Sequence, residues 1–308
     1  MNVLKVPVSR GLDWMKAAVN VGVRNPRAVF GAAALFLATL YLFAVLAVLP
    51  VAARLEGRTD MTLREIATTA ISLFVVVTLV LPVLLAGLIG VMHAAEEGRP
   101  ARARDLFSAF GHGHARPLMA LGLVQIVFNL ACATLIVVLA GPDYWAESMK
   151  AAQGAMSGHV IVPPNPEHPA LLFVLQLVQF VFNYFSAALM LLCVPLIMLT
   201  RVSLVESLKL GFRASIVNLG ANLLASLIFI VGFVVAGLFI GLIATVVAGI
   251  AALVNPALGV AVTLLVLGAF SVTVLVVLVA GSYYAWRDMF ERAGDDDTVR
   301  PALVQIEA

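Results

Sequence analysis

The residues best suited to chemistry in this sequence are side-chain amides that lie inside long apolar segments. They are Gln125, Asn129, Gln176, Gln179, Asn183, Asn218 and Asn222. Within each segment they recur every three or four residues, so they share one face of a helix. A polar group surrounded by hydrocarbon needs a hydrogen-bond partner. These amides therefore either join neighbouring helices or line a polar pocket for a lipid headgroup or a small solute. We favour joining, since such amides contribute only about 0.6 kcal/mol each and are widespread.

Groups that usually carry catalysis are not found centrally in these apolar segments. No Asp, Glu or His lies there, which disfavours an ion-coupled pump. The sequence has no Walker loop, no Gly-x-Ser-x-Gly and no His-Glu-x-x-His. His112 and His114 flank Gly113, but a metal site needs three or four convergent ligands. We therefore expect no catalytic residues, no metal, no cofactor and no enzyme activity.

The elements that must position the amides are membrane-spanning helices. Of the 308 residues, 62% are apolar and 12% are charged, against roughly a quarter charged in a soluble domain. This composition excludes a soluble globular protein, a disordered protein and a nucleic-acid binder. A spanning helix needs about 20 mainly apolar residues. Six runs qualify, at 28–53, 66–92, 118–140, 170–199, 219–247 and 257–285. The predicted fold is all-α, with one transmembrane domain over 1–294 and a tail over 295–308.

The distribution of basic residues predicts the orientation. When the loops are assigned alternately to the two sides, fifteen of the 19 lysines and arginines fall on the side of both termini. Basic residues concentrate on the cytoplasmic side of membrane proteins, so both termini are predicted to be cytoplasmic.

Three short amphipathic segments precede the first, third and fifth apolar runs. In the third segment Ser203 and Glu206 have capping-box spacing, and Leu204, Leu208 and Phe212 follow on one face. In the first segment Leu12, Met15 and Val19 stack in the same way. We expect three helices in the plane of the membrane interface, with apolar residues toward the lipid and basic residues at the headgroups. The pattern predicts a threefold repeat of one short helix and one hairpin, over about 1–100, 101–200 and 201–294.

Some of these segments also carry a family resemblance. Val6-Pro7-Val8-Ser9-Arg10-Gly11-Leu12-Asp13-Trp14, followed by Arg24-Asn25-Pro26, resembles the opening of an uncharacterised bacterial six-span inner-membrane family. Ser203-x-x-Glu-Ser-Leu through Asn218, with Tyr283 and Tyr284, is similar to a wider set. That set includes the membrane domain of some glycerophosphodiester phosphodiesterases. The resemblance implies a six-helix protein of the bacterial inner membrane and no particular activity.

Two functions remain after these exclusions. The first is a non-catalytic protein that contacts anionic lipids, or a protein partner, at the cytoplasmic interface. Its contact residues would be the basic side chains in and beside the three short segments: Lys16, Arg24, Arg27, Arg104, Arg116, Lys209 and Arg213. The second is a transporter or lipid-translocating protein with a polar path between the third and fourth spans. We expect lipid contact, because the basic residues are the polar feature that recurs in every repeat.

Overall fold

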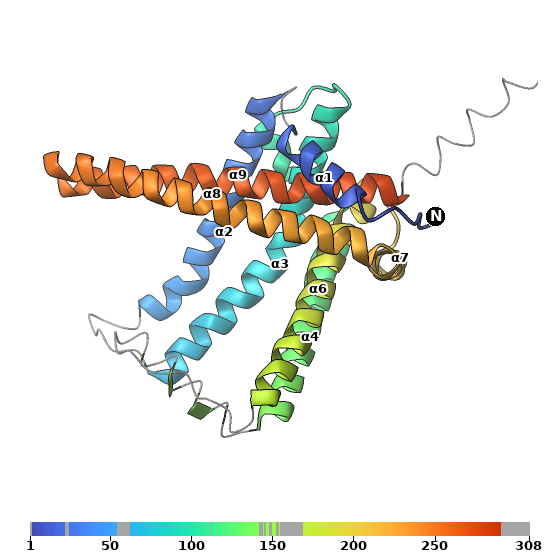
Figure 1. Cartoon of the computed structure of the whole chain (residues 1–308), viewed down its shortest axis with the longest axis horizontal. Coiled ribbons are helices and arrows are strands. Elements are labelled where there is room, and N and C mark those ends of the chain that lie inside the picture. The colour runs from blue at the N-terminus through green and yellow to red at the C-terminus, as the bar shows by residue number, and fades with distance from the viewer. Residues whose placement is uncertain are drawn as a thin grey trace, which may run out of the picture. The chain divides into compact units, whose positions relative to one another are not determined.

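The computed structural model describes residues 2–21, 25–53, 62–111, 113–141 and 169–290, together with 144, 146–147, 150–151 and 154. All regular secondary structure in these residues is helical, as Figure 1 shows. The elements are α1 (Arg10–Val19), α2 (Pro26–Ala52), α3 (Leu63–Glu96), η1 (Ala103–Phe110), α4 (Ala115–Ala140), α6 (Pro169–Leu199), α7 (Leu204–Val217), α8 (Leu219–Val254) and α9 (Pro256–Phe290).

The prediction of six spanning helices is confirmed. Helices α2, α3, α4, α6, α8 and α9 are each long and apolar enough to cross a membrane. The largest difference lies at the turn between the fifth and sixth spans, where the predicted runs 219–247 and 257–285 leave nine residues between them. The structure continues α8 to Val254 and leaves only Asn255 outside a helix. One residue is enough because Asn255 Oδ1 accepts the Ala257 N–H at 2.8 Å, while Pro256, at the first helical position, has no N–H that would need an acceptor.

Local sequence explains where several helices begin. Ser203 Oγ accepts the Glu206 N–H at 3.3 Å, which confirms this half of the predicted capping box. Asn25 Oδ1 accepts the Ala28 N–H at 3.2 Å and starts α2. The other side-chain atom of Asn25, Nδ2, donates to the Ala101 carbonyl just before η1. The contacts of Ser203 Oγ and Asn25 Oδ1 each satisfy a backbone amide that the first helical turn leaves without a partner.

The helices divide into two compact units. The first unit comprises residues 1–39, 83–118 and 191–308, and the second comprises 40–82 and 119–190. In the second unit α4 packs on α3 and α6. A Cβ atom at Gly122 would lie 2.6 Å from the Thr78 carbonyl oxygen, so the two backbones touch at this glycine. The rings of Phe128 and Phe182 lie 4.9 Å apart and fill the contact between α4 and α6.

In the first unit, each short helix packs against the second long helix of a different hairpin. A Cβ atom at Gly87 of α3 would lie 1.7 Å from the Leu106 carbonyl oxygen of η1, so η1 sits directly on this glycine. Cys193 Sγ of α6 lies 3.2 Å from the Ser207 carbonyl oxygen of α7. The short helices of the second and third repeats thus pack on the hairpins that precede them.

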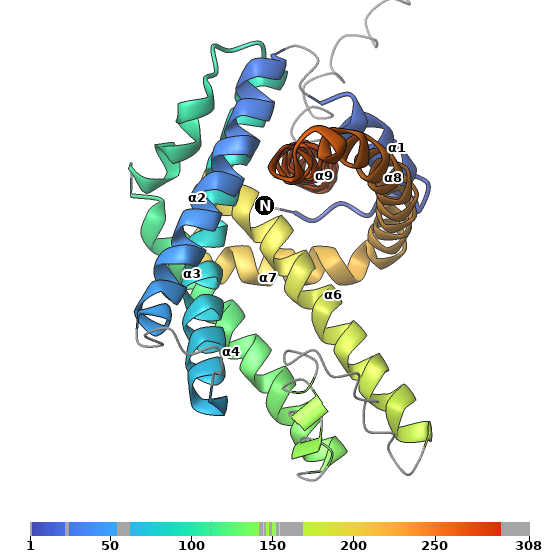
Figure 2. The same cartoon turned by 90° about the vertical axis from the view of Figure 1, so that its left-hand side faces the viewer.

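Helix α1 completes this arrangement by packing on the last hairpin. A Cβ atom at Gly281 of α9 would lie 3.2 Å from Met15 Sδ, and one at Gly11 would lie 2.4 Å from the Ala221 carbonyl oxygen of α8. Figures 1 and 2 both show α1 beside α8 and α9. Each predicted repeat therefore packs its short helix on the hairpin of another repeat: the second on the first, the third on the second and the first on the third. The N-terminal segment thus lies against the end of the chain's last span.

Candidate functional site

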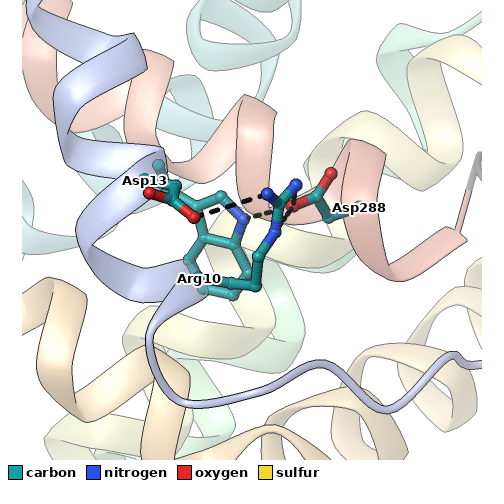
Figure 3. Close-up of polar contacts among 4 residues, drawn as sticks. Arg10, Asp13 and Asp288 are labelled. Atoms are coloured by element: carbon teal, nitrogen blue, oxygen red, sulfur yellow. Dashed lines mark hydrogen bonds and ion pairs between the residues drawn. The ribbon is translucent and has the colours of Figure 1, made fainter.

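A buried ionic cluster joins α1 to the end of α9. Asp288 is 4% exposed and lies two residues before the end of α9. Its Oδ2 accepts the Arg10 Nε–H at 2.8 Å, a second guanidinium N–H of the same arginine, and the Trp14 Nε1–H at 2.8 Å (Figure 3). Arg10 also faces Asp13, with 3.4 Å between Nη1 and Oδ2. A buried carboxylate must be paired and hydrogen-bonded, and this cluster supplies both.

The chain before α1 is tied to the same region by an asparagine. Asn218, at the junction of α7 and α8, accepts the Val6 N–H at 2.9 Å through Oδ1. Its Nδ2 donates to the Leu4 carbonyl oxygen at 3.0 Å. The Leu4 N–H in turn donates to the Met289 carbonyl oxygen at 3.0 Å. Asn218 was predicted to belong to a polar intramembrane face. The structure uses its side chain to hold an extended segment against the junction of two helices.

A second polar contact joins α3 to α9. His93 Nδ1 lies 3.0 Å from the Tyr283 hydroxyl, and His93 Nε2 lies 3.3 Å from Glu97 Oε1. Tyr283 is buried, and the Arg287 guanidinium carbon lies 5.1 Å from the centre of the Tyr284 ring. The two tyrosines of the family resemblance thus lie in the polar end of α9. Within the described ranges, no group of three His, Cys, Asp or Glu residues could hold a metal ion.

The predicted basic residues all lie in the first unit and are exposed wherever the structure describes them. They are Lys16, Arg27, Arg104, Arg116, Lys209 and Arg213, and we name this set the basic collar. Arg24, which was predicted with them, lies outside the described residues. No member of the basic collar forms an ion pair with another described residue. The basic collar is therefore available to an anionic ligand.

Helix α7 separates the residues that pack on the protein from the residues that face outward. Its buried residues are all small: Ser207, Gly211, Ala214 and Ser215. Large apolar side chains on the other side are exposed, among them Val205, Phe212 and Ile216. Lys209 and Arg213 follow this exposed stripe around the helix. An apolar stripe flanked by basic side chains suits a helix that lies at the membrane interface.

Helix α1 has the same organisation, but the three apolar residues predicted to share one face, Leu12, Met15 and Val19, do not all face the same way. Gly11, Trp14, Met15 and Ala18 are buried against α8 and α9. Met15 therefore packs on the protein, whereas Leu12 and Val19 are exposed beside Lys16. Their spacing predicts that all three apolar residues lie on one lipid-facing surface. The structure moves Met15 because Gly281 leaves room for its sulfur atom.

The amides of the third and fourth spans do not converge on one cavity. Gln125 is buried, and its Nε2 donates to the Ser186 carbonyl oxygen at 2.8 Å. The Ser186 hydroxyl donates back to Gln125 Oε1 at 2.7 Å. Asn129 Nδ2 donates to the Gln125 carbonyl oxygen at 2.8 Å, within its own helix. These contacts join α4 to α6 and satisfy the buried amide of Gln125.

The remaining predicted amides lie elsewhere. Gln176, Gln179 and Asn183 are exposed on α6, in the second unit. Asn222 is half-buried at the start of α8, in the first unit, and its backbone N–H donates to the Asn218 carbonyl oxygen at 3.0 Å. The seven predicted amides are thus distributed over separate places rather than gathered in one site.

The fold and this site define a polytopic helical membrane protein whose polar contacts concentrate at the ends of its helices. No family model, curated protein or solved structure matches the chain. The resemblance to the six-span inner-membrane family stays a prediction.

Sequence reasoning missed the ionic cluster of Arg10, Trp14 and Asp288. One signal could have revealed it. Asp288 is the first acidic residue after Glu206, and it lies in the last turn of an apolar helix. An acidic side chain is disfavoured at a helix C-terminus, so an unusual partner is required there. The identity of that partner is not readable from the sequence, because Arg10 is 278 positions away.

Proposed function

We propose that this chain is a non-catalytic protein of the bacterial inner membrane that binds anionic lipid at its cytoplasmic face. The observation that carries this proposal is the basic collar: six exposed cations on one compact unit that form no ion pair with another described residue. A basic side chain near anionic headgroups gains about 1 kcal/mol. Several such side chains on one compact unit therefore make a favourable surface for anionic lipid.

The short helices supply the second part of the argument. Helices α1 and α7 each turn small or buried residues toward the protein and present apolar residues beside a basic one. Because α1 is fixed by the Asp288 cluster, Lys16 is held in place relative to α8 and α9. The helix that carries Lys16 is thus preorganised, which lowers the entropy lost on binding.

The orientation follows from the same residues. The positive-inside distribution assigns the basic collar and both termini to the cytoplasmic side. The inner leaflet surface is negative, so the collar would meet lipids of opposite charge.

Native mass spectrometry of the protein, extracted gently from its own membrane, tests the proposal. Replacing Arg104, Lys209 and Arg213 by Gln should reduce the amount of retained phosphatidylglycerol at least tenfold, given about 1 kcal/mol for each charge. Arg64→Gln with Lys150→Gln is the matched control, since both residues are exposed and lie in the second unit. Equal retention in the two variants would contradict the proposal. A stoichiometric second protein that leaves with the collar charges would make the ligand a protein partner.

The alternative function is transport along a polar path between α4 and α6. Its one supporting observation is the exposed amide stripe of Gln176, Gln179 and Asn183 on α6. Gln125 does not support it, because its side chain is occupied by Ser186. Transport requires that replacement of the α6 amides by Leu abolish solute flux while the unfolding temperature stays unchanged.

A further inference from the structure

An apolar pocket lies where α1 meets α8 and α9, inside the first unit. Its volume is about 370 Å³, within the range of roughly 300–1,000 Å³ typical of small-ligand sites. Lys16 and Thr273 are the polar side chains in its lining, among apolar residues such as Leu12, Val19 and Phe233. The Thr273 hydroxyl donates to the Ala269 carbonyl oxygen at 2.9 Å, so it is already satisfied by its own helix. The exposed surface of the lining is almost wholly apolar, so Lys16 lines the pocket mainly through its aliphatic chain and is the charged residue beside it.

Gly232 leaves space in the lining of the pocket. A Cβ atom built at Gly232 would meet no atom within 4 Å. Gly232 lines the pocket, so a larger side chain at this position would occupy space in it. The ring centres of Phe229 and Phe233 lie 6.4 Å apart and those of Phe233 and Phe270 lie 5.8 Å apart, both in stacked pairs. The aromatic residues at the pocket are therefore held in place.

The lengths of α8 and α9 place the pocket near a membrane surface. The two helices contain 36 and 35 residues, whereas about 20 residues span the hydrocarbon core. Their shared base carries Asn218, Arg287 and Asp288 and does not suit hydrocarbon. The pocket begins at Ile228, about nine residues or roughly 14 Å beyond the start of α8. A polar base outside the hydrocarbon would put Lys16 at the headgroup level and the pocket beside the acyl chains.

We propose that this pocket binds one acyl chain of an anionic phospholipid, whose phosphate is held by Lys16. The inference rests on the proposed function, because it names the lipid that binds at Lys16, a member of the basic collar, and the pocket that holds its acyl chain. An acyl chain suits a narrow apolar lining, and burying its methylene groups supplies the affinity. Lys16 is exposed and forms no ion pair with any other described residue, so its ammonium group is free for a phosphate.

Photolabelling tests the seat of the chain. The probe is phosphatidylglycerol with a diazirine in one acyl chain, as a minor component of phosphatidylcholine vesicles that contain the full-length protein. The label is expected on residues 228–236 and 273–277. Gly232→Leu should reduce this labelling about tenfold, the effect of displacing roughly two methylene groups. Gly241→Leu is the matched control, since it makes the same change on the same helix, also in open space.

Lys16→Gln tests the headgroup. This variant should keep the label in the pocket but reduce the preference for phosphatidylglycerol over equally labelled phosphatidylcholine by about fivefold. Labelling of Gly232→Leu equal to that of Gly241→Leu would overturn the acyl-chain assignment, and an unchanged preference in Lys16→Gln would overturn the headgroup assignment. Helical circular dichroism and elution volume confirm that each variant is folded.

The two proposals can fail separately. If neutralising Arg104, Lys209 and Arg213 removes phosphatidylglycerol while Gly232→Leu leaves the labelling of the pocket unchanged, only the pocket inference fails. If the pocket variants behave as expected while the collar triple variant retains its lipid, the wider collar fails and lipid binding is restricted to the Lys16 seat.

Discussion

The ionic cluster at the end of α9 makes a prediction about how firmly α1 is held. Removing one partner of a buried ion pair costs about 3–5 kcal/mol. Arg10 is 26% exposed, so water screens part of this interaction, and the Trp14 indole still donates to Asp288. We therefore expect Arg10→Gln to lower the free energy of α1 opening by about 2 kcal/mol. This change corresponds to roughly 30-fold faster amide exchange over residues 10–19.

Hydrogen exchange measured by mass spectrometry reads this opening directly. Asp13→Asn is the control, because Asp13 contacts the same arginine from an exposed position and such a pair contributes only about 0–1 kcal/mol. The double variant Arg10→Gln with Asp288→Asn should recover most of the protection, since it leaves no charge buried without a partner. The reasoning is refuted if Arg10→Gln accelerates exchange no more than Asp13→Asn, or if the double variant is less protected than Arg10→Gln.

Three further predictions concern other contacts. Gly87→Ala should lower the unfolding temperature, because its Cβ would overlap a carbonyl oxygen of η1 and such overpacking costs about 1–3 kcal/mol. Gly90→Ala, which meets only a flexible methionine tip, should change it little, and equal melting of the two variants would argue against this packing. Gln125→Leu and Ser186→Ala should show a coupling free energy of about 0.6 kcal/mol in a double-mutant cycle of unfolding in detergent. Additive effects of the two substitutions would mean that these side chains do not hold α4 and α6 together. Asn218→Ala should free two backbone groups of the N-terminal segment and speed its amide exchange about tenfold or more, whereas unchanged exchange would mean that the segment is held by other contacts.

The sequence alone determined the properties that depend on composition and on local spacing. Six apolar runs of sufficient length predict six spans because the hydrocarbon core tolerates few charges, and the helices lie where the runs do. The helix start at Ser203 followed from two residues three positions apart. Short helices before the first, third and fifth spans were also predicted, since amphipathic spacing is a property of one segment, and helices lie at these places.

Only the tertiary structure decided which surfaces pack against each other. Periodicity reveals an apolar stripe, but in a membrane the lipid is as apolar as a protein core, so large side chains need not turn inward. Helix α7 shows this: it buries Ser207 and Gly211 and leaves Phe212 exposed. The contact of Arg10 with Asp288 was equally hidden, because it depends on bringing the two ends of the chain together. The apolar pocket beside Lys16 has the same origin, since it exists only where three separately encoded helices meet.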